Sequence, residues 1–169
     1  SKPSLNYYQT LHVGKVKTDV IQYTSIQSAI DAITDNAAGK RYAVYVHPGT
    51  YSEKITMEDY VDLIAQGGRA ETIISFTATA HDEPTLTAEN AAISGFTIVS
   101  DGSGGTLRAR CVQAATAGFA MKDCVLVAQN SAAVAIAFNA TASCGIDDSV
   151  IDNAAGAATA ALFLSLIHI

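Results

Sequence analysis

The chain has 169 residues, a formal net charge of −6 and a sequence pI near 5.0. This length indicates one domain with a sizeable core, and the acidic balance argues against nucleic acid as a partner. The three cysteines lack metal-ligand spacing, so neither a disulfide framework nor a zinc site is expected. The longest apolar run, residues 154–169, is shorter than the ~20 residues of a membrane-spanning helix, so no membrane partner is expected.

The N-terminal part of the chain predicts an extended lead-in over residues 1–22, with one short strand at residues 11–13. Thr24 and Gln27 then fit a capping box at the start of a helix over residues 24–38. The helix would have one apolar stripe, at i, i+3, i+4 and i+7: Ile26, Ala29, Ile30 and Ile33. We expect it to cover the open end of the core and to prevent edge pairing there.

A six-residue pattern occurs three times, at residues 93–98, 121–126 and 146–151, with spacings of 28 (121 − 93) and 25 (146 − 121) residues. A second series of apolar positions lies between these copies: Leu86, Val112, Ile136 and Leu162. Two interleaved strand series with one shared period are typical of a parallel β-solenoid. The sequence therefore predicts one all-β domain over residues 23–169, with about five to six coils over residues 42–165.

Alternation along the strands predicts which side chains face the core. Phe96, Cys124 and Ser149 should share an inward column, whereas four valines should face outward: Val99, Val125, Val127 and Val150. A stacked apolar face of this kind exceeds what a monomer usually exposes, so it predicts an oligomer interface, with a homotrimer as the expected assembly. A register shifted by one residue would instead send these valines inward, and the sequence leaves that alternative open.

Aspartates near the third copy of the pattern are candidates for chemistry. Asp147 and Asp148 would be a catalytic carboxylate pair if a turn lies between them, since adjacent strand residues otherwise face opposite ways. Asp123 and Asp148 should stack one rung apart, and a calcium ion would suit that stack. The alternative is that these aspartates bond to the backbone of their own turns, with no cofactor.

Three segments carry a family resemblance: residues 23–32 (YTSIQSAIDA), 44–53 (VYVHPGTYSE) and 93–98 (ISGFTI). Together they resemble the right-handed parallel β-helix proteins of the pectinesterase and pectate-lyase-like superfamily, and pectin methylesterases in particular. The resemblance extends over residues 23–100, about half of the chain. It implies a right-handed parallel β-helix with an N-terminal capping helix. It also implies that Gly49, Tyr51 and Glu53 shape the substrate side of a groove.

The catalytic motifs of that family are missing from this sequence. There is no Gln-Ala-Val-Ala segment and no Asp-Phe-Ile-Phe-Gly segment, and the chain has no Trp for an Arg-Pro-Trp motif. The nearest fragments are residues 133–136 and 129–130, the latter with an amide where the family has a carboxylate. Ester hydrolysis needs a nucleophile, an acid–base group and oxyanion donors in one groove, so the sequence favours a protein without catalysis.

The last six residues, 164–169, break the small-residue composition before them and resemble a translated sequencing adapter from metagenomic assembly. The natural protein is then expected to continue, and later coils could hold catalytic residues.

The sequence as a whole leads to two hypotheses about function. The first is a self-associating, structural or carbohydrate-contacting β-helix module, as in phage tail proteins or adhesins, virion-associated or extracellular. The second is a pectin-active esterase, lyase or hydrolase.

Overall fold

The computed structural model describes residues 6–103, 107–114, 118–129, 134–138 and 144–153. The chain forms one short helix, α1 (Ile26–Asp31), and otherwise strands within these residues. In order, the strands are β1 (Gln9–Val13), β2 (Tyr42–Val46), β3 (Gly49–Ser52), β4 (Ile55–Thr56), β5 (Val61–Ala65), β6 (Thr72–Ala78), β7 (Glu83–Ala88), β8 (Ala92–Ser94), β9 (Thr97–Gly102), β10 (Ala109–Ala114), β11 (Phe119–Lys122), β12 (Val125–Ala128), β13 (Val134–Phe138), β14 (Cys144–Asp147) and β15 (Val150–Asn153).

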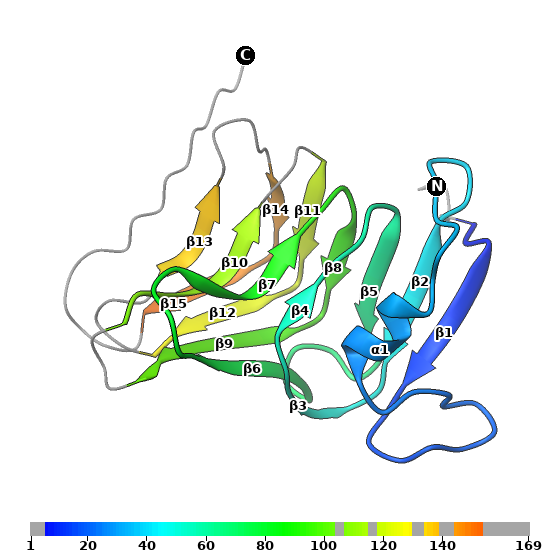
Figure 1. Ribbon diagram of the computed structural model, residues 1–169, viewed down its shortest axis with the longest axis horizontal. Helices are drawn as coiled ribbons and strands as arrows, with labels where there is room; N and C mark the ends of the chain where they lie inside the picture. Colours follow the sequence, from blue (N-terminus) through cyan, green and yellow to red (C-terminus); the bar gives the residue numbers. More distant parts are fainter. Residues whose placement is uncertain (1–5, 104–106, 115–117, 130–133, 139–143, 154–169) are drawn as a thin grey trace.

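The strands stack into three parallel sheets, and successive coils add one strand to each (Figure 1). Sheet A has the order β1-β2-β5-β8-β11-β14, sheet B has β13-β10-β7-β4, and sheet C has β15-β12-β9-β6-β3. This is the predicted right-handed parallel β-helix, and the five strands of sheet A from β2 to β14 agree with the expected five to six coils. No helix among the described residues is long and apolar enough to span a membrane.

Strand pairing confirms both repeat series. Met121 pairs with Ile93 and with Ile146 in sheet A. Val112 pairs with Leu86 and with Ile136 in sheet B, whereas the last predicted member of that series, Leu162, lies outside the described residues. The series also begins one coil earlier than predicted, because Ile55 of β4 pairs with Leu86.

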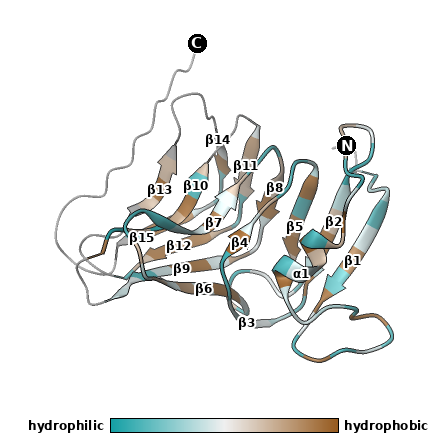
Figure 2. Cartoon of the chain, in the orientation of Figure 1, coloured by the Kyte–Doolittle hydropathy of each residue, from teal (hydrophilic) through white to brown (hydrophobic). Residues whose placement is uncertain are grey.

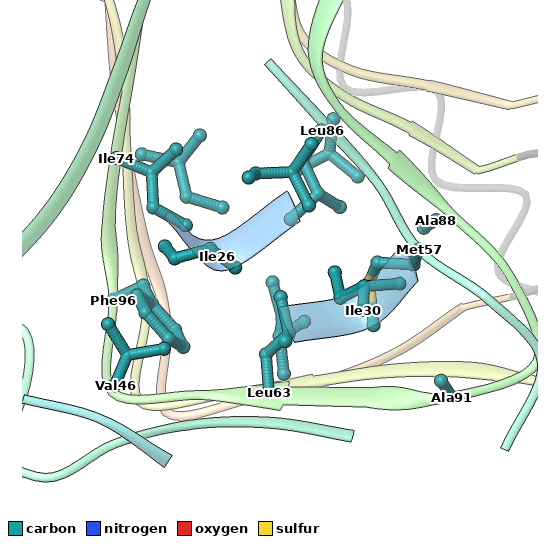
Figure 3. Close-up of a cluster of buried hydrophobic side chains, with 14 of the residues drawn as sticks. Ile26, Ile30, Val46, Met57, Leu63, Ile74, Leu86, Ala88, Ala91 and Phe96 are labelled. Carbon is teal, nitrogen blue, oxygen red and sulfur yellow. The ribbon is translucent and has the colours of Figure 1, made fainter. Parts of the chain in front are cut away.

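The core is the triangular space between the three sheets. Side chains from all three fill it, and Ile26 and Ile30 of α1 point into the same space (Figure 3). Phe96, Cys124 and Leu126 are fully buried and Ser149 is half-buried, whereas the outward valines of β9 and β12 are only partly buried. The predicted inward and outward register is therefore confirmed, and the register shifted by one residue is wrong.

The helix is shorter than predicted and begins differently. Ser25, not Thr24, is the N-cap, and its side chain accepts a hydrogen bond from the backbone N–H of Ser28. The helix ends at Asp31 rather than near residue 38. The following segment turns back toward β2 through a bridge between Ala37 and Lys40, and this turn is incompatible with a continued helix. The predicted apolar stripe is still buried, because Ile33 packs on the core just beyond the helix.

The predicted lead-in is part of the solenoid. Its strand, β1, pairs with β2 and forms the first strand of sheet A. Gln22 and Tyr23 lie along the outer edge of β1, where both backbone N–H groups donate to the carbonyl oxygen of His12. The Gly14 N–H in turn donates to the Tyr23 carbonyl oxygen over 3.0 Å. This returning segment occupies the edge groups of β1, while α1 covers the core.

Candidate functional site

Tyr51, predicted to bind substrate, lies inside the first coil. Its side chain is 2% exposed, and its hydroxyl donates to the carbonyl oxygen of His47 over 2.8 Å. Burial, followed by the nearby negative charge of Glu53, raises the pKa of Tyr51. The buried ring packs the first coil, and a role of Tyr51 in substrate binding stays a prediction.

Glu53, the other predicted substrate-binding residue, holds the N-terminus of α1. One carboxylate oxygen accepts from the backbone N–H of Ile26 (2.9 Å), and the other accepts from the N–H of Gln27 (3.1 Å) and the hydroxyl of Ser25 (2.8 Å). A negative charge is favourable at a helix N-terminus, where N–H groups have no partner within the helix. These bonds give Glu53 a structural role that needs no substrate.

Gly49, the third residue of that motif, has a φ of 151°. A Cβ atom at this position would lie 2.8 Å from Cγ of Lys15, so a larger residue would displace the lysine. Lys15 places its ammonium 5.0 Å from the centre of the Tyr51 ring and donates to the carbonyl oxygen of Thr50. Gly49, Tyr51 and Glu53 therefore all take part in the packing of the first coil.

Asp123 and Asp148 occupy the same turn in successive coils, between the strands of sheet A and sheet C. Both have a positive φ, 49° and 45°, and Gly95 has a φ of 79° in the equivalent turn of the coil before. Aspartate tolerates this left-handed conformation better than most residues. The repeated Gly or Asp of the six-residue pattern is therefore explained by the backbone of this turn.

Arg69 lies against the stack that Asp123 and Asp148 form. One of its guanidinium nitrogens is 3.3 Å from a carboxylate oxygen of Asp123 and donates to the backbone carbonyl of Asp148 over 3.2 Å. The hydroxyl of Thr97 donates to the Arg69 carbonyl over 2.7 Å, which ties the turn of Arg69 to β9. We refer to Arg69, Asp123 and Asp148 as the arginine corner.

The arginine corner bears on the predicted calcium site. A stack of carboxylates needs positive charge beside it, and the guanidinium of Arg69 supplies that charge beside the Asp123 carboxylate. Among the described residues, no group of three or more His, Cys, Asp or Glu side chains could hold a metal ion. A calcium ion at this stack stays a prediction.

Asp147 and Asp148 are separated by the turn that the pairing hypothesis required, and both are exposed. The Asp147 carboxylate lies 3.9 Å from the ammonium of Lys122 in the preceding coil, whereas the backbone carbonyl of Asp148 faces Arg69. The two residues thus have different partners, and their pairing as acid and base stays a prediction.

The four valines of the predicted interface lie together on the outer face of sheet C. Register places Thr97, Val125 and Val150 in one column and Val99 beside Val127 in the next. Ile73 extends the first column to β6, and hydrophobic segments run along β6, β9 and β12 (Figure 2). We define the valine face by these six residues: Ile73, Thr97, Val99, Val125, Val127 and Val150.

Polar residues border the valine face. Ser75 and Asp152 stand at the two ends of the column that contains Val99 and Val127. Thr77 and Asp101 form the next column along sheet C. Five residues of the face are half-buried by their neighbours, and Val150 is 48% exposed.

One feature of these sites was not visible in the sequence. Arg69 was not singled out because only stacking of the coils brings residue 69 next to residues 123 and 148. Asn130, the nearest counterpart of a family carboxylate, lies outside the described residues, and so does Ala133. In the sequence, Arg69 directly follows Gly67 and Gly68, and a cation in such a turn is a signal that could have singled it out. That signal does not reveal Asp123 and Asp148 as its partners.

No family model matches the sequence, and no curated protein matches it. Solved structures do match. The pectin methylesterase PemA of Erwinia chrysanthemi superposes with a TM-score of 0.64 at 16% identity, over 88% of this chain and 50% of that one. This chain has the fold of the pectin methylesterases.

Two further pectin methylesterases give the same result. One, in complex with hexasaccharide VII, has a TM-score of 0.62 at 14% identity, over 89% of this chain and 55% of that one. The enzyme from carrot has a TM-score of 0.55 at 14% identity, over 89% and 54%. The chain thus spans about half the length of these pectin methylesterases. At these identities the likeness concerns the fold, which alone does not carry function.

Proposed function

We propose that this chain is a non-catalytic β-helix module that associates with copies of itself through the valine face. The observation that supports this most is the alignment of Val99, Val125, Val127 and Val150 on the outside of one sheet. Parallel sheets are usually covered on both faces, and the inner face of sheet C already packs on the core. The module would serve as a structural or carbohydrate-contacting part of a larger assembly, with a trimer as the expected state.

The occupant that fits this face is a second copy of the same face. Its β-branched side chains repeat at the ~4.8 Å spacing of stacked strands, so an identical face offers the same spacing for interdigitation. Full burial of an exposed valine contributes ~1.5–3 kcal/mol, and roughly half of that remains for valines that are already half-buried. No lysine or arginine is among the six residues, so association would not bury an unpaired positive charge.

Light scattering coupled to size exclusion tests this proposal at micromolar concentration. We expect an oligomer from the unaltered chain and a monomer from Val127→Glu or Val99→Glu, with circular dichroism to verify the fold. The matched control is Val16→Glu, since Val16 is 69% exposed and lies in the segment between β1 and α1. A monomeric unaltered chain would overturn the proposal.

A pectin-active enzyme is the second candidate. It is supported by the arginine corner, which gathers a guanidinium and two aspartates from distant turns on an accessible surface, and by the activity named for the structural neighbours. Methanol release from methyl-esterified pectin and uronate cleavage, with and without calcium, test this candidate. Activity that is lost in Asp148→Asn but kept in Asp152→Asn would favour the enzyme over the structural module.

A further inference from the structure

Two histidines from neighbouring coils meet on the outer face of sheet A. His12 lies on β1, and His47 directly follows β2. Nδ1 of His12 is 3.1 Å from Nε2 of His47. The Tyr45 ring stacks on His12, with ring centres 5.4 Å apart and an interplanar angle of 30°. The pair is far in sequence from the arginine corner and the valine face, and neither proposed function uses it.

The backbone holds both histidines in place. The His12 N–H donates to the side-chain oxygen of Gln22 over 2.9 Å, and its carbonyl accepts from the N–H groups of Gln22 and Tyr23. The His47 N–H donates to the Val13 carbonyl, and its own carbonyl accepts from the Tyr51 hydroxyl, both over 2.8 Å. Both residues are partly buried, so the ring nitrogens keep access to solvent while little backbone freedom remains to be lost on binding.

The nitrogen separation suits a shared metal ion. A neutral imidazole has one N–H and one lone pair, so one proton must lie between two ring nitrogens at this distance. With metal–nitrogen bonds of about 2.0–2.1 Å, a separation of 3.1 Å corresponds to an angle at the metal of about 100°. That angle lies between the octahedral and tetrahedral values. Chelation requires each proton to sit on the other ring nitrogen, Nε2 of His12 and Nδ1 of His47, so that both facing nitrogens carry a lone pair.

The site also favours the neutral form of the His12 ring, which is the form that binds metals. Burial, and then the proximity of His47, lower the pKa of His12. Imidazole is a preferred ligand of Zn²⁺, Ni²⁺ and Cu²⁺, whereas Ca²⁺ and Mg²⁺ prefer oxygen.

We propose that His12 and His47 bind one first-row divalent metal ion of the Zn²⁺, Ni²⁺ or Cu²⁺ type, with water completing the coordination. The ion would connect β1 to the end of β2, the two outermost strands at the N-terminal end of sheet A. Binding to the folded chain would raise its thermal midpoint in proportion to the logarithm of metal concentration.

Isothermal titration of the untagged full chain with ZnCl₂ and with NiCl₂ at pH 7.5 tests the proposal. We expect one site per chain, weakened by roughly tenfold or more in His12→Ala and in His47→Gln. His81→Ala is the matched control, because His81 lies in the turn before β7 of sheet B and its removal should leave the titration unchanged. CaCl₂ should give no binding at this site, and acidification to pH 5.5 should weaken the zinc isotherm.

Two outcomes would overturn the metal site: no binding of either ion by the unaltered chain, or binding that persists at full strength in both histidine variants. If circular dichroism shows that one of the two histidine variants does not fold, the titration of the other variant tests the site. A rise in thermal midpoint with ZnCl₂ in the unaltered chain, absent from the histidine variants, would support the proposal independently.

Discussion

The first coil and the coils from β8 onward are stabilised differently. At the N-terminal end, α1 and the residues just before β1 and β2 are held by polar contacts between unlike residues that are 21 to 55 positions apart, such as those of Glu53 and Asp62. In the later coils, like side chains lie over like, and register alone places Val125 on Thr97 and Val150 on Val125. The end of a β-helix has polar groups with no neighbouring coil to bond to, so it needs specific side-chain contacts. An interior coil is stabilised by packing on equivalent residues of the coils before and after it.

The largest expected effect is in the repeated core. Phe96 is fully buried, so Phe96→Ala should reduce the free energy of unfolding by about 3–5 kcal/mol through lost contacts and a cavity. Urea denaturation followed by circular dichroism measures this loss. The matched control is Phe76→Ala, because Phe76 is only partly buried against the same core. Equal losses of unfolding free energy in the two variants would contradict the idea that burial in the repeated core is the source of the stability.

The next effect concerns a buried carboxylate near the N-terminal end. Asp62 is 1% exposed and accepts from the Arg41 guanidinium (2.6 Å), the Tyr7 hydroxyl (3.0 Å) and the Ala92 N–H (2.9 Å). Asp62→Asn removes the charge that balances Arg41, and we expect a loss of about 2–3 kcal/mol in urea denaturation. Asp59→Asn is the control, since Asp59 is exposed and accepts one hydrogen bond that an amide oxygen can also accept. A larger loss in the control would rule out burial as the cause.

The cap of α1 should contribute less. Glu53→Gln leaves one acceptor oxygen for three donors and removes the negative charge at the helix N-terminus, so we expect a loss of about 1–2 kcal/mol. The same denaturation experiment measures it. Glu58→Gln, at an exposed position after β4, should change stability by less than about 0.5 kcal/mol. If both variants match the unaltered chain, the carboxylate does not hold the helix.

In the later coils, the one charged contact of the arginine corner should be weaker than either N-terminal contact. The Arg69 and Asp123 side chains are 35% and 44% exposed, so Arg69→Gln should cost less than about 1 kcal/mol. Lys122→Gln is the control, because its pair with Asp147 is longer and more exposed. A loss from Arg69→Gln as large as that from Asp62→Asn would show that the later coils also depend on charge.

The smallest effect is a pH dependence of the first coil. Burial, followed by His47, lowers the pKa of His12 below its usual value of about 6.5. Between the lowered pKa and 6.5 the unfolded chain binds more protons, so stability is fully present above about pH 6.5 and is lost as pH falls through the folded pKa. Thermal melts in EDTA from pH 7.5 to 5 measure this, and His12→Gln should flatten the slope. An unchanged slope would exclude His12 as its source.

The sequence by itself determined the parallel β-solenoid, the positions of the strands in the regular coils and the side chains that face inward, whereas its right-handedness was implied by the family resemblance. It could do so because period-two alternation and a period of about 25 residues are both visible along the chain. The buried stripe of the first helix was also predictable, since i, i+3, i+4 and i+7 spacing depends on local geometry.

Only the tertiary structure decided what the polar residues do. The sequence could not show that Tyr51 is buried, that Glu53 caps α1, that Arg69 reaches Asp123 and Asp148, or that His12 meets His47. Each of these contacts joins side chains from different coils. Such side chains become neighbours only when the coils stack, and the handedness and length of each turn set which ones meet.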